Sequence, residues 1–226
     1  MGAPVPTVDF GFPRSWEAEV LAARPAILPA RHFVYPRDAE EVERGALEVL
    51  VRPTAAHERN EIEFSAVPPI RRKDGEWMGH GDLSECPAEP ARDVRPFLAT
   101  CALGFRDPVV PNGIWATPHP DWLCAVSGGY AYLIDTAAPE RFAMIPLRPV
   151  LEVKALADAG LLLFVGHRSV LAWSRDGQAW DSEKLSDEGL TITGIEDGLM
   201  RGLGWEMRTD KETPFALDLR TGLRVS

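Results

Sequence analysis

The chain has 226 residues, of which 45 % are hydrophobic and 26 % are charged, as in an ordinary globular protein. This composition excludes wholesale disorder, and the 20 prolines and 19 glycines leave too few uninterrupted helical windows for a coiled coil. The 34 acidic residues outnumber the 24 lysines and arginines, which gives a net charge of −10. A chain this acidic is not attracted to a phosphate backbone, so we predict no nucleic-acid partner.

Targeting and redox features are few. The first twenty residues contain neither the basic nor the apolar segment of a signal peptide. The longest apolar run, residues 160–166, is far shorter than the roughly 20 residues that a membrane-spanning helix needs. The three cysteines, Cys86, Cys101 and Cys124, are widely spaced and form no CxxC motif, so we expect reduced thiols. We therefore predict a cytoplasmic protein without membrane association, metal site or cofactor.

The beginning of the chain is rich in proline. Six prolines occur up to Pro36, and because proline removes a backbone donor, we expect an extended arm that packs on the rest of the protein. One short helix is predicted over residues 15–23, where Ser15 could cap the helix and Trp16 and Val20 would face inward.

We predict that residues 1–96 form an N-terminal region, and the remainder of this region is predicted to contain a helix or turn, two strands and a long loop. Residues 38–44 are predicted to form a short helix or an acidic turn. Residues 46–52 and 61–67 have the apolar content or the period-two alternation of strands. Residues 68–96 are polar and irregular, and they are predicted to form a long loop.

Residues 97–226 are predicted to form a repeat-containing all-β domain. Short β-rich runs recur about every ten residues and end at Gly, Pro or Asp, with no convincing helical window between them. Such spacing is typical of antiparallel sheets joined by hairpins. The expected strands cover residues 97–103, 113–117, 123–127, 130–135, 142–146, 150–156, 161–165, 170–174, 180–185, 190–195, 199–205, 215–219 and 223–225.

An internal repeat sharpens this prediction. Residues 123–135 align with residues 162–174 at an offset of 39, and residues 170–177 resemble residues 215–222 at an offset of 45. Periods near 40 with four strands are typical of propeller blades. Gly128 and Gly129 are predicted to form a two-residue hairpin turn, because such turns need positive φ at both central residues.

A family resemblance follows from these residues. The segment LLLFVGHRSVLAWSRDGQAWDSEKL resembles a blade of the quinoprotein-type β-propellers, and the resemblance covers residues 114–225 as about three four-stranded units. It implies a mostly β, antiparallel, propeller-like array. Closed propellers have at least four blades, so either the strands before residue 96 add a blade or the array stays partial. Quinone binding is not implied, because three units form no complete central channel. The phrases FLATCALGF, GGYAYLIDT and GWEMRTD also resemble an uncharacterised bacterial family, which implies no activity.

The motifs of common enzymes are absent from the sequence. No zincin, nucleophile-elbow, dinucleotide-binding or phosphate-loop motif occurs. The pair His80 and Asp82 in the predicted long loop is the candidate catalytic site, since a carboxylate can orient an imidazole and raise its basicity. The alternative is an ordinary polar loop. His119 and Asp121 in a predicted turn allow the same two interpretations.

Five of the seven tryptophans fall in the repeat region, and they are candidate ligand-binding residues. Indoles at this density could line a groove and stack on a ligand. The alternative, which we favour, is that they fill the gaps between neighbouring sheets. These residues are Trp115, Trp122, Trp173, Trp180 and Trp205.

Two hypotheses of function follow. The first is a non-enzymatic module that binds a protein or a small molecule. The second is a small hydrolase or lyase that uses His80 and Asp82. A stack of four-stranded sheets also has exposed edges that natural proteins cover or pair, so a homodimer is a further expectation.

Overall fold

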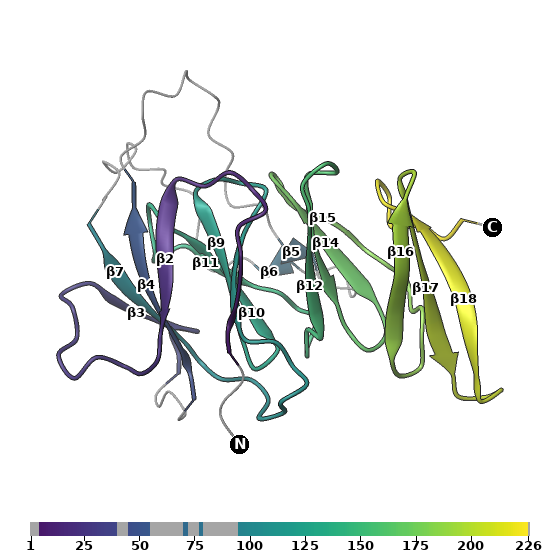
Figure 1. The fold of residues 1–226 in the computed structure, drawn as a ribbon, viewed down its shortest axis with the longest axis horizontal. Coiled ribbons are helices and arrows are strands. Elements are labelled where there is room, and N and C mark those ends of the chain that lie inside the picture. Colours follow the sequence, from purple (N-terminus) through teal and green to yellow (C-terminus); the bar gives the residue numbers. More distant parts are fainter. Residues whose placement is uncertain (1–4, 40–44, 55–69, 72–76, 79–94, 226) are drawn as a thin grey trace.

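The computed structural model describes residues 5–39, 45–54, 70–71, 77–78 and 95–225. Within these residues every regular element is a β-strand, which confirms the predicted all-β class. The strands form four sheets and one short hairpin, and none of the sheets closes on itself. The four sheets stand side by side along the longest axis of the molecule (Figure 1). The chain begins with β1 in the second sheet, forms the first sheet, and from β8 on passes through the second, third and fourth sheets in order.

The first sheet has the strand order β2-β4-β7-β3, in which β3 is parallel to β7 and the other pairs are antiparallel. The predicted helix over residues 15–23 is wrong, because β2 occupies this segment. Trp16, Ala18 and Val20 alternate with two exposed glutamates, and this period of two matches a strand whose hydrogen bonds are supplied by β4. The strands are β2 (Trp16–Leu21), β3 (His32–Tyr35), β4 (Leu47–Pro53) and β7 (Phe97–Cys101).

The second sheet has the order β1-β8-β9-β10-β11 and is antiparallel except for β1, which runs parallel to β8. The prolines up to Pro36 are therefore interspersed with strands of two different sheets, where the sequence predicts an extended arm. The strands are β1 (Thr7–Asp9), β8 (Gly113–Ala116), β9 (Trp122–Ser127), β10 (Tyr130–Asp135) and β11 (Phe142–Met144).

The third and fourth sheets are antiparallel meanders whose strands follow chain order. Most predicted strands agree with the observed ones to within a few residues. However, β15 begins three residues before the predicted strand 180–185, and β18 begins four residues before the predicted strand 215–219. The predicted last strand is reduced to one bridge between Leu217 and Arg224. The strands are β12 (Glu152–Leu156), β13 (Leu161–Val165), β14 (Val170–Ser174), β15 (Gly177–Asp181), β16 (Leu190–Glu196), β17 (Leu199–Glu206) and β18 (Lys211–Asp218).

The predicted hairpin turn at Gly128 and Gly129 is confirmed. Ser127 pairs with Tyr130, and the two glycines between them have φ values of 55° and 74°. A residue with a Cβ is strained at such angles, so these two positions favour glycine.

Two further predictions concern residues before 97. The described parts of the predicted long loop are β5 (Ile70–Arg71) and β6 (Trp77–Met78), which pair as a short antiparallel hairpin. The predicted strand at residues 61–67 lies outside the described residues, as does most of the segment 38–44. Residue 97, where we predict the second region to begin, starts β7, which lies between β4 and β3.

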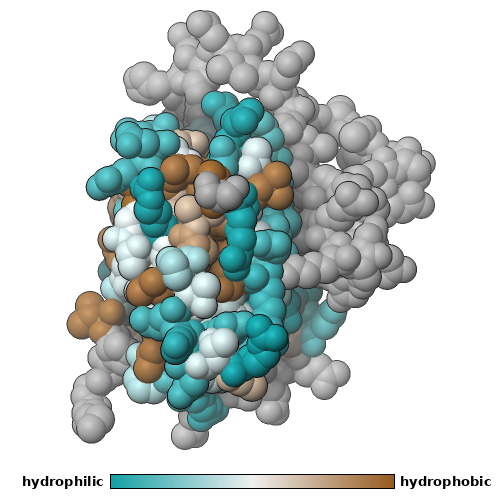
Figure 2. All heavy atoms as spheres, turned by 90° about the vertical axis from the view of Figure 1, so that its right-hand side faces the viewer, coloured by the Kyte–Doolittle hydropathy of each residue, from teal (hydrophilic) through white to brown (hydrophobic). Residues whose placement is uncertain are grey.

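The core occupies the spaces between the sheets. One buried cluster joins the first three sheets and contains Trp16, Tyr35, Leu123 and Phe164. A second cluster lies between the third and fourth sheets. The outer face of the fourth sheet carries hydrophobic and hydrophilic residues in separate small patches, as seen in the view toward that end of the molecule (Figure 2).

Candidate functional site

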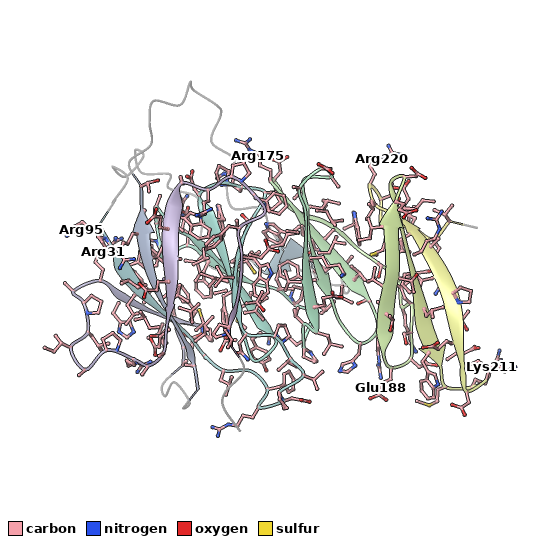
Figure 3. All side chains as sticks on the ribbon, viewed as in Figure 1. Arg31, Arg95, Arg175, Glu188, Lys211 and Arg220 are labelled. Atoms are coloured by element: carbon pink, nitrogen blue, oxygen red, sulfur yellow. The ribbon has the colours of Figure 1, made fainter. Side chains whose placement is uncertain are left out.

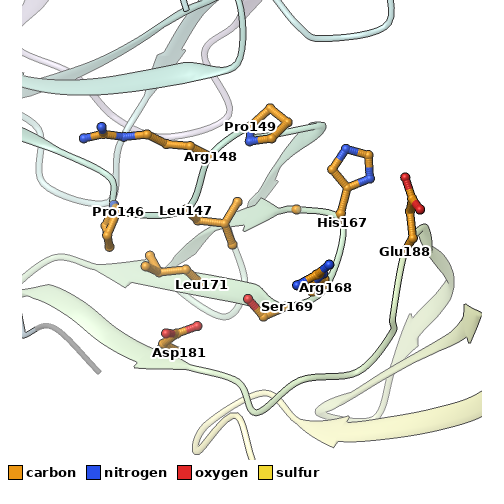
Figure 4. A pocket seen from close by; sticks show the side chains of 11 residues that line it. Pro146, Leu147, Arg148, Pro149, His167, Arg168, Ser169, Leu171, Asp181 and Glu188 are labelled. Atoms are coloured by element: carbon orange, nitrogen blue, oxygen red, sulfur yellow. The ribbon is translucent and has the colours of Figure 1, made fainter. Parts of the chain in front are cut away.

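A pocket of about 570 Å³ opens between the second and third sheets. One wall is the link between β11 and β12, residues 146–149, and another is the turn between β13 and β14, residues 166–169. Leu171 on β14 and Asp181 on β15 line the pocket from the third sheet, and the exposed Glu188 of the β15–β16 loop lies at the rim (Figure 4). The pocket therefore combines side chains from the third sheet and from three connections, one of which joins the second sheet to the third.

The wall formed by the link is fixed by backbone hydrogen bonds at its end. The amide of Val150 donates to the carbonyl of Gly129 at 2.8 Å, and the amide of Leu151 donates to the carbonyl of Val165 at 2.7 Å. Leu147 packs on Gly166, where an added Cβ would lie only 2.6 Å from Cδ2 of Leu147. Glycine at position 166 thus gives Leu147 the space to line the pocket.

The second wall is a tight turn that carries two exposed side chains, His167 and Arg168. The amide of Gly166 donates to the carbonyl of Ser169 at 3.0 Å and closes the turn. Nε of Arg168 donates to the backbone carbonyl of Asp187 at 2.8 Å, and the carbonyl of Arg168 accepts from the amide of Leu185 at 2.7 Å. These bonds anchor the guanidinium at the mouth of the pocket.

Charges of both signs line the pocket. Arg148 and Arg168 are balanced by Asp181 and Glu188, so the lining has no net formal charge in a chain of net charge −10. The Arg148 guanidinium lies over the ring of Tyr130, 5.0 Å from its centroid. In Figure 4, His167 and Glu188 stand near each other, Asp181 lies on the other side, and Leu147 and Leu171 lie between them.

A polar network on the first sheet is a second feature of interest. Nε of Arg24 lies 2.8 Å from Oε1 of the buried Glu48, and the hydroxyl of Thr100 donates to Oε2 of Glu48 at 2.5 Å. Nε2 of His32 lies 2.8 Å from the same hydroxyl oxygen. Because the single hydroxyl hydrogen goes to Glu48, we infer that Thr100 accepts from His32 Nε2–H. His32, Thr100 and Glu48 lie on the adjacent strands β3, β7 and β4.

The histidine in this network is biased toward its neutral form. Burial and the positive charge of Arg24 lower the pKa of His32 below its usual value of 6.5, and Glu48 opposes the shift only in part. Sequence reasoning did not select His32, although one signal was available: Glu48 interrupts the apolar residues 47–51 of β4. A charged residue there requires partners on the neighbouring strands.

Asp135 is another buried carboxylate, and its role is structural. It pairs with Arg141 at 2.5 Å and accepts hydrogen bonds from the amides of Ala137 and Ala138. Burial raises its pKa, against the opposing effect of Arg141 and these amides. Asp135 thus shapes the β10–β11 connection.

The predicted catalytic pair, His80 and Asp82, lies outside the described residues, as does Cys86. His119 and Asp121 lie in the turn between β8 and β9, where Nδ1 of His119 accepts from the amide of Asp121 at 3.2 Å. The carboxylate of Asp121 also accepts a short hydrogen bond from the hydroxyl of Ser15. These bonds connect the turn to the residue that precedes β2.

The five candidate tryptophans do not meet in one groove. Trp115, Trp122 and Trp173 belong to the core cluster of the first three sheets, and Trp180 belongs to the cluster beside the fourth sheet. The indole of Trp180 donates to the carbonyl of Leu219 at 2.7 Å. Trp205 on β17 is partly exposed. Four of the indoles thus fill gaps between sheets, and ligand binding by this set stays a prediction.

Cys101 and Cys124 are free thiols in the core, and burial raises the pKa of each, so neither is a thiolate at neutral pH. Among the described residues, no three His, Cys, Asp or Glu side chains gather as metal ligands. No helix in that part of the chain has the length and hydropathy to cross a membrane.

No protein-family model matches the chain, and no curated protein matches it.

Proposed function

We propose that this protein is a non-enzymatic binding module that holds a small molecule in the pocket between the second and third sheets. The pocket itself is the observation that carries the proposal. Its volume of about 570 Å³ falls within the roughly 300–1,000 Å³ that is usual for small-molecule sites. Its lining combines apolar surface from Leu147 and Leu171 with a small number of charged groups.

The way in which the pocket is built supports binding without large rearrangement. Its two walls are held by backbone hydrogen bonds at Val150, Leu151 and Gly166, so the cavity is present in the unliganded chain. Preformed sites require less ordering of the protein when a ligand binds.

We further infer that the second, third and fourth sheets are propeller-like units of an open array. The strands β8 to β11 and β12 to β15 each form a four-stranded meander in chain order. The sequence offset of 39 residues aligns the β9–β10 hairpin with the β13–β14 hairpin, and the turn of the latter forms one wall of the pocket. The proposed site thus lies where two such units meet.

The proposal is tested by amide NMR spectra of the full chain, recorded with a library of small compounds of varied charge. We expect shift changes to cluster at residues 147–151, 166–169 and 181–188. Compounds that shift only residues of the fourth sheet would overturn the proposal, and so would a library in which nothing binds at millimolar concentration.

The variant Leu147→Asp provides a matched check. Leu147 is half-buried and lines the pocket, so a carboxylate there should abolish binding of apolar compounds. The control is Leu223→Asp, which places the same change on an exposed leucine near the C-terminus. Equal binding by the two variants would contradict the proposed location.

A further inference from the structure

We infer, on the basis of the function proposed above, that the pocket recognises a small zwitterion with an apolar body, such as a dipeptide. The inference comes from the sign and placement of the charges that line the pocket. It specifies the class of ligand, which the proposed function leaves open.

The charge balance excludes the other classes of ligand in turn. A net anion would meet two carboxylates in the lining and the field of a chain with net charge −10. A net cation would meet two guanidinium groups. A neutral apolar ligand would remove water from charged groups without replacing the lost hydrogen bonds, which is costly. A zwitterion can offer a carboxylate to Arg168 and an ammonium group to Glu188.

The cationic side of the pocket is suited to a carboxylate. Nε of Arg168 is occupied by the carbonyl of Asp187, which fixes the guanidinium plane. Among the described residues this is the one hydrogen bond made by the Arg168 side chain, so its Nη groups can pair with a carboxylate of the ligand. His167 is exposed on the same turn, and its ring N–H can donate to the same carboxylate.

The opposite requirement, an acceptor for an ammonium group, is met by Glu188. Its side chain is exposed at the rim and comes from a different connection than Arg168 (Figure 4). Leu147 lies on the other side of Arg168 from Glu188 and supplies apolar contact there (Figure 4). A zwitterion that carries an apolar side chain beside its two charges matches this arrangement.

The test uses leucyl-leucine and three derivatives that share its side chains: the N-acetyl form, the C-terminal amide and the doubly capped form. Dissociation constants are measured by calorimetry on the full chain. We expect leucyl-leucine to bind most tightly and each single cap to weaken binding at least tenfold. Equal binding of the doubly capped form, or tighter binding of either singly capped form, would overturn the inference.

Two variants assign the two ends of the ligand. Arg168→Gln should abolish the preference for the free carboxylate over the amide. Glu188→Gln should abolish the preference for the free amine over the acetylated form. The control is Arg175→Gln, an exposed arginine at the other end of β14, which should leave both preferences unchanged (Figure 3). If either pocket variant keeps both preferences, the assignment is wrong.

The two proposals fail in different ways. If pocket amides shift with library compounds but leucyl-leucine and its derivatives bind equally or not at all, the ligand class is wrong and the binding function stands. If no compound of any charge shifts these amides, the binding function itself is wrong.

Discussion

The hydroxyl of Thr100 joins a hydrogen-bond acceptor to a hydrogen-bond donor: it donates to the buried carboxylate of Glu48 at 2.5 Å and accepts from the imidazole of His32 at 2.8 Å. Both bonds cross between neighbouring strands of the first sheet. Arg24 completes the network at the other carboxylate oxygen. The two contacts that join β3, β7 and β4 on this face therefore depend on one hydroxyl group.

Replacing Thr100 with valine should reveal this dependence. Thr100→Val keeps the shape of the side chain but leaves Glu48 Oε2 and His32 Nε2 without their partner, so we expect a loss of about 1–3 kcal/mol in the free energy of unfolding. Urea denaturation measures the loss. Thr193→Val, on the exposed side of β16, should change stability by less than about 0.5 kcal/mol. Equal effects at both positions would show that the network contributes nothing specific.

The lowered pKa of His32 predicts a pH dependence of stability. The unfolded chain takes up a proton at His32 as the pH falls through about 6.5, whereas the folded chain takes it up only at lower pH. The wild type should therefore lose stability between pH 7.5 and pH 5.5. His32→Gln should lose less over this range, as measured by urea midpoints. The titration of Asp135 is common to both proteins and cancels in the comparison. A larger loss of stability in the variant would show that the pKa of His32 is raised in the folded chain, not lowered.

Two hairpin glycines allow the cost of backbone strain to be measured apart from the cost of a steric clash when a Cβ is added. Gly128 and Gly198 both have left-handed φ, 55° and 73°, but a Cβ on Gly128 would lie 2.6 Å from the carbonyl oxygen of Phe105, while one on Gly198 would meet nothing within 4 Å. Gly198→Ala should cost about 1–2 kcal/mol from strain alone. Gly128→Ala should cost a further 1–3 kcal/mol, roughly, from overpacking. Thermal melts compare the two, and equal midpoints would rule out the close contact.

Gly166→Ala should affect the pocket more than the fold. The added methyl group displaces Leu147, whose flexible end can move, so we expect a loss of less than about 1.5 kcal/mol in stability. The displaced leucine should shrink the cavity and weaken ligand binding. Calorimetry with leucyl-leucine on the wild type and the variant measures the change in binding. Urea denaturation of the same two proteins measures the change in stability. A variant that binds as well as wild type would show that Leu147 does not shape the site.

Much of the architecture could be predicted because its signals are local. The Gly128 and Gly129 turn, and the short apolar runs on either side of it, specify the β9–β10 hairpin within a few residues. The error at residues 15–23 has an identifiable cause: Trp16 and Val20 fit a helical spacing as well as the strand period, and β4, which decides between them, lies about 30 residues further along the chain.

The candidate site could be predicted less well, because it depends on distant residues. His32, Glu48 and Thr100 come together only when β3, β4 and β7 form one sheet, and no spacing in the sequence indicates that order. The pocket needs the link at residues 146–149 to cross the β13–β14 turn. The density of tryptophan did not indicate the position of the pocket, since large aromatic side chains fill the wide gaps between sheets as readily as they line a ligand site.

The pairing of the N-terminal strands has a consequence for synthesis of the chain. Thr7 pairs with Gly113 and His32 pairs with Leu98, so β1 and β3 leave the ribosome well before the strands that they require. The third and fourth sheets consist of sequential hairpins and can form as soon as they emerge. A nascent chain that stops before residue 97 carries β4 with the edge normally covered by β7 still open. Such an open edge is prone to aggregation, so translation through this interval sets the period of greatest risk.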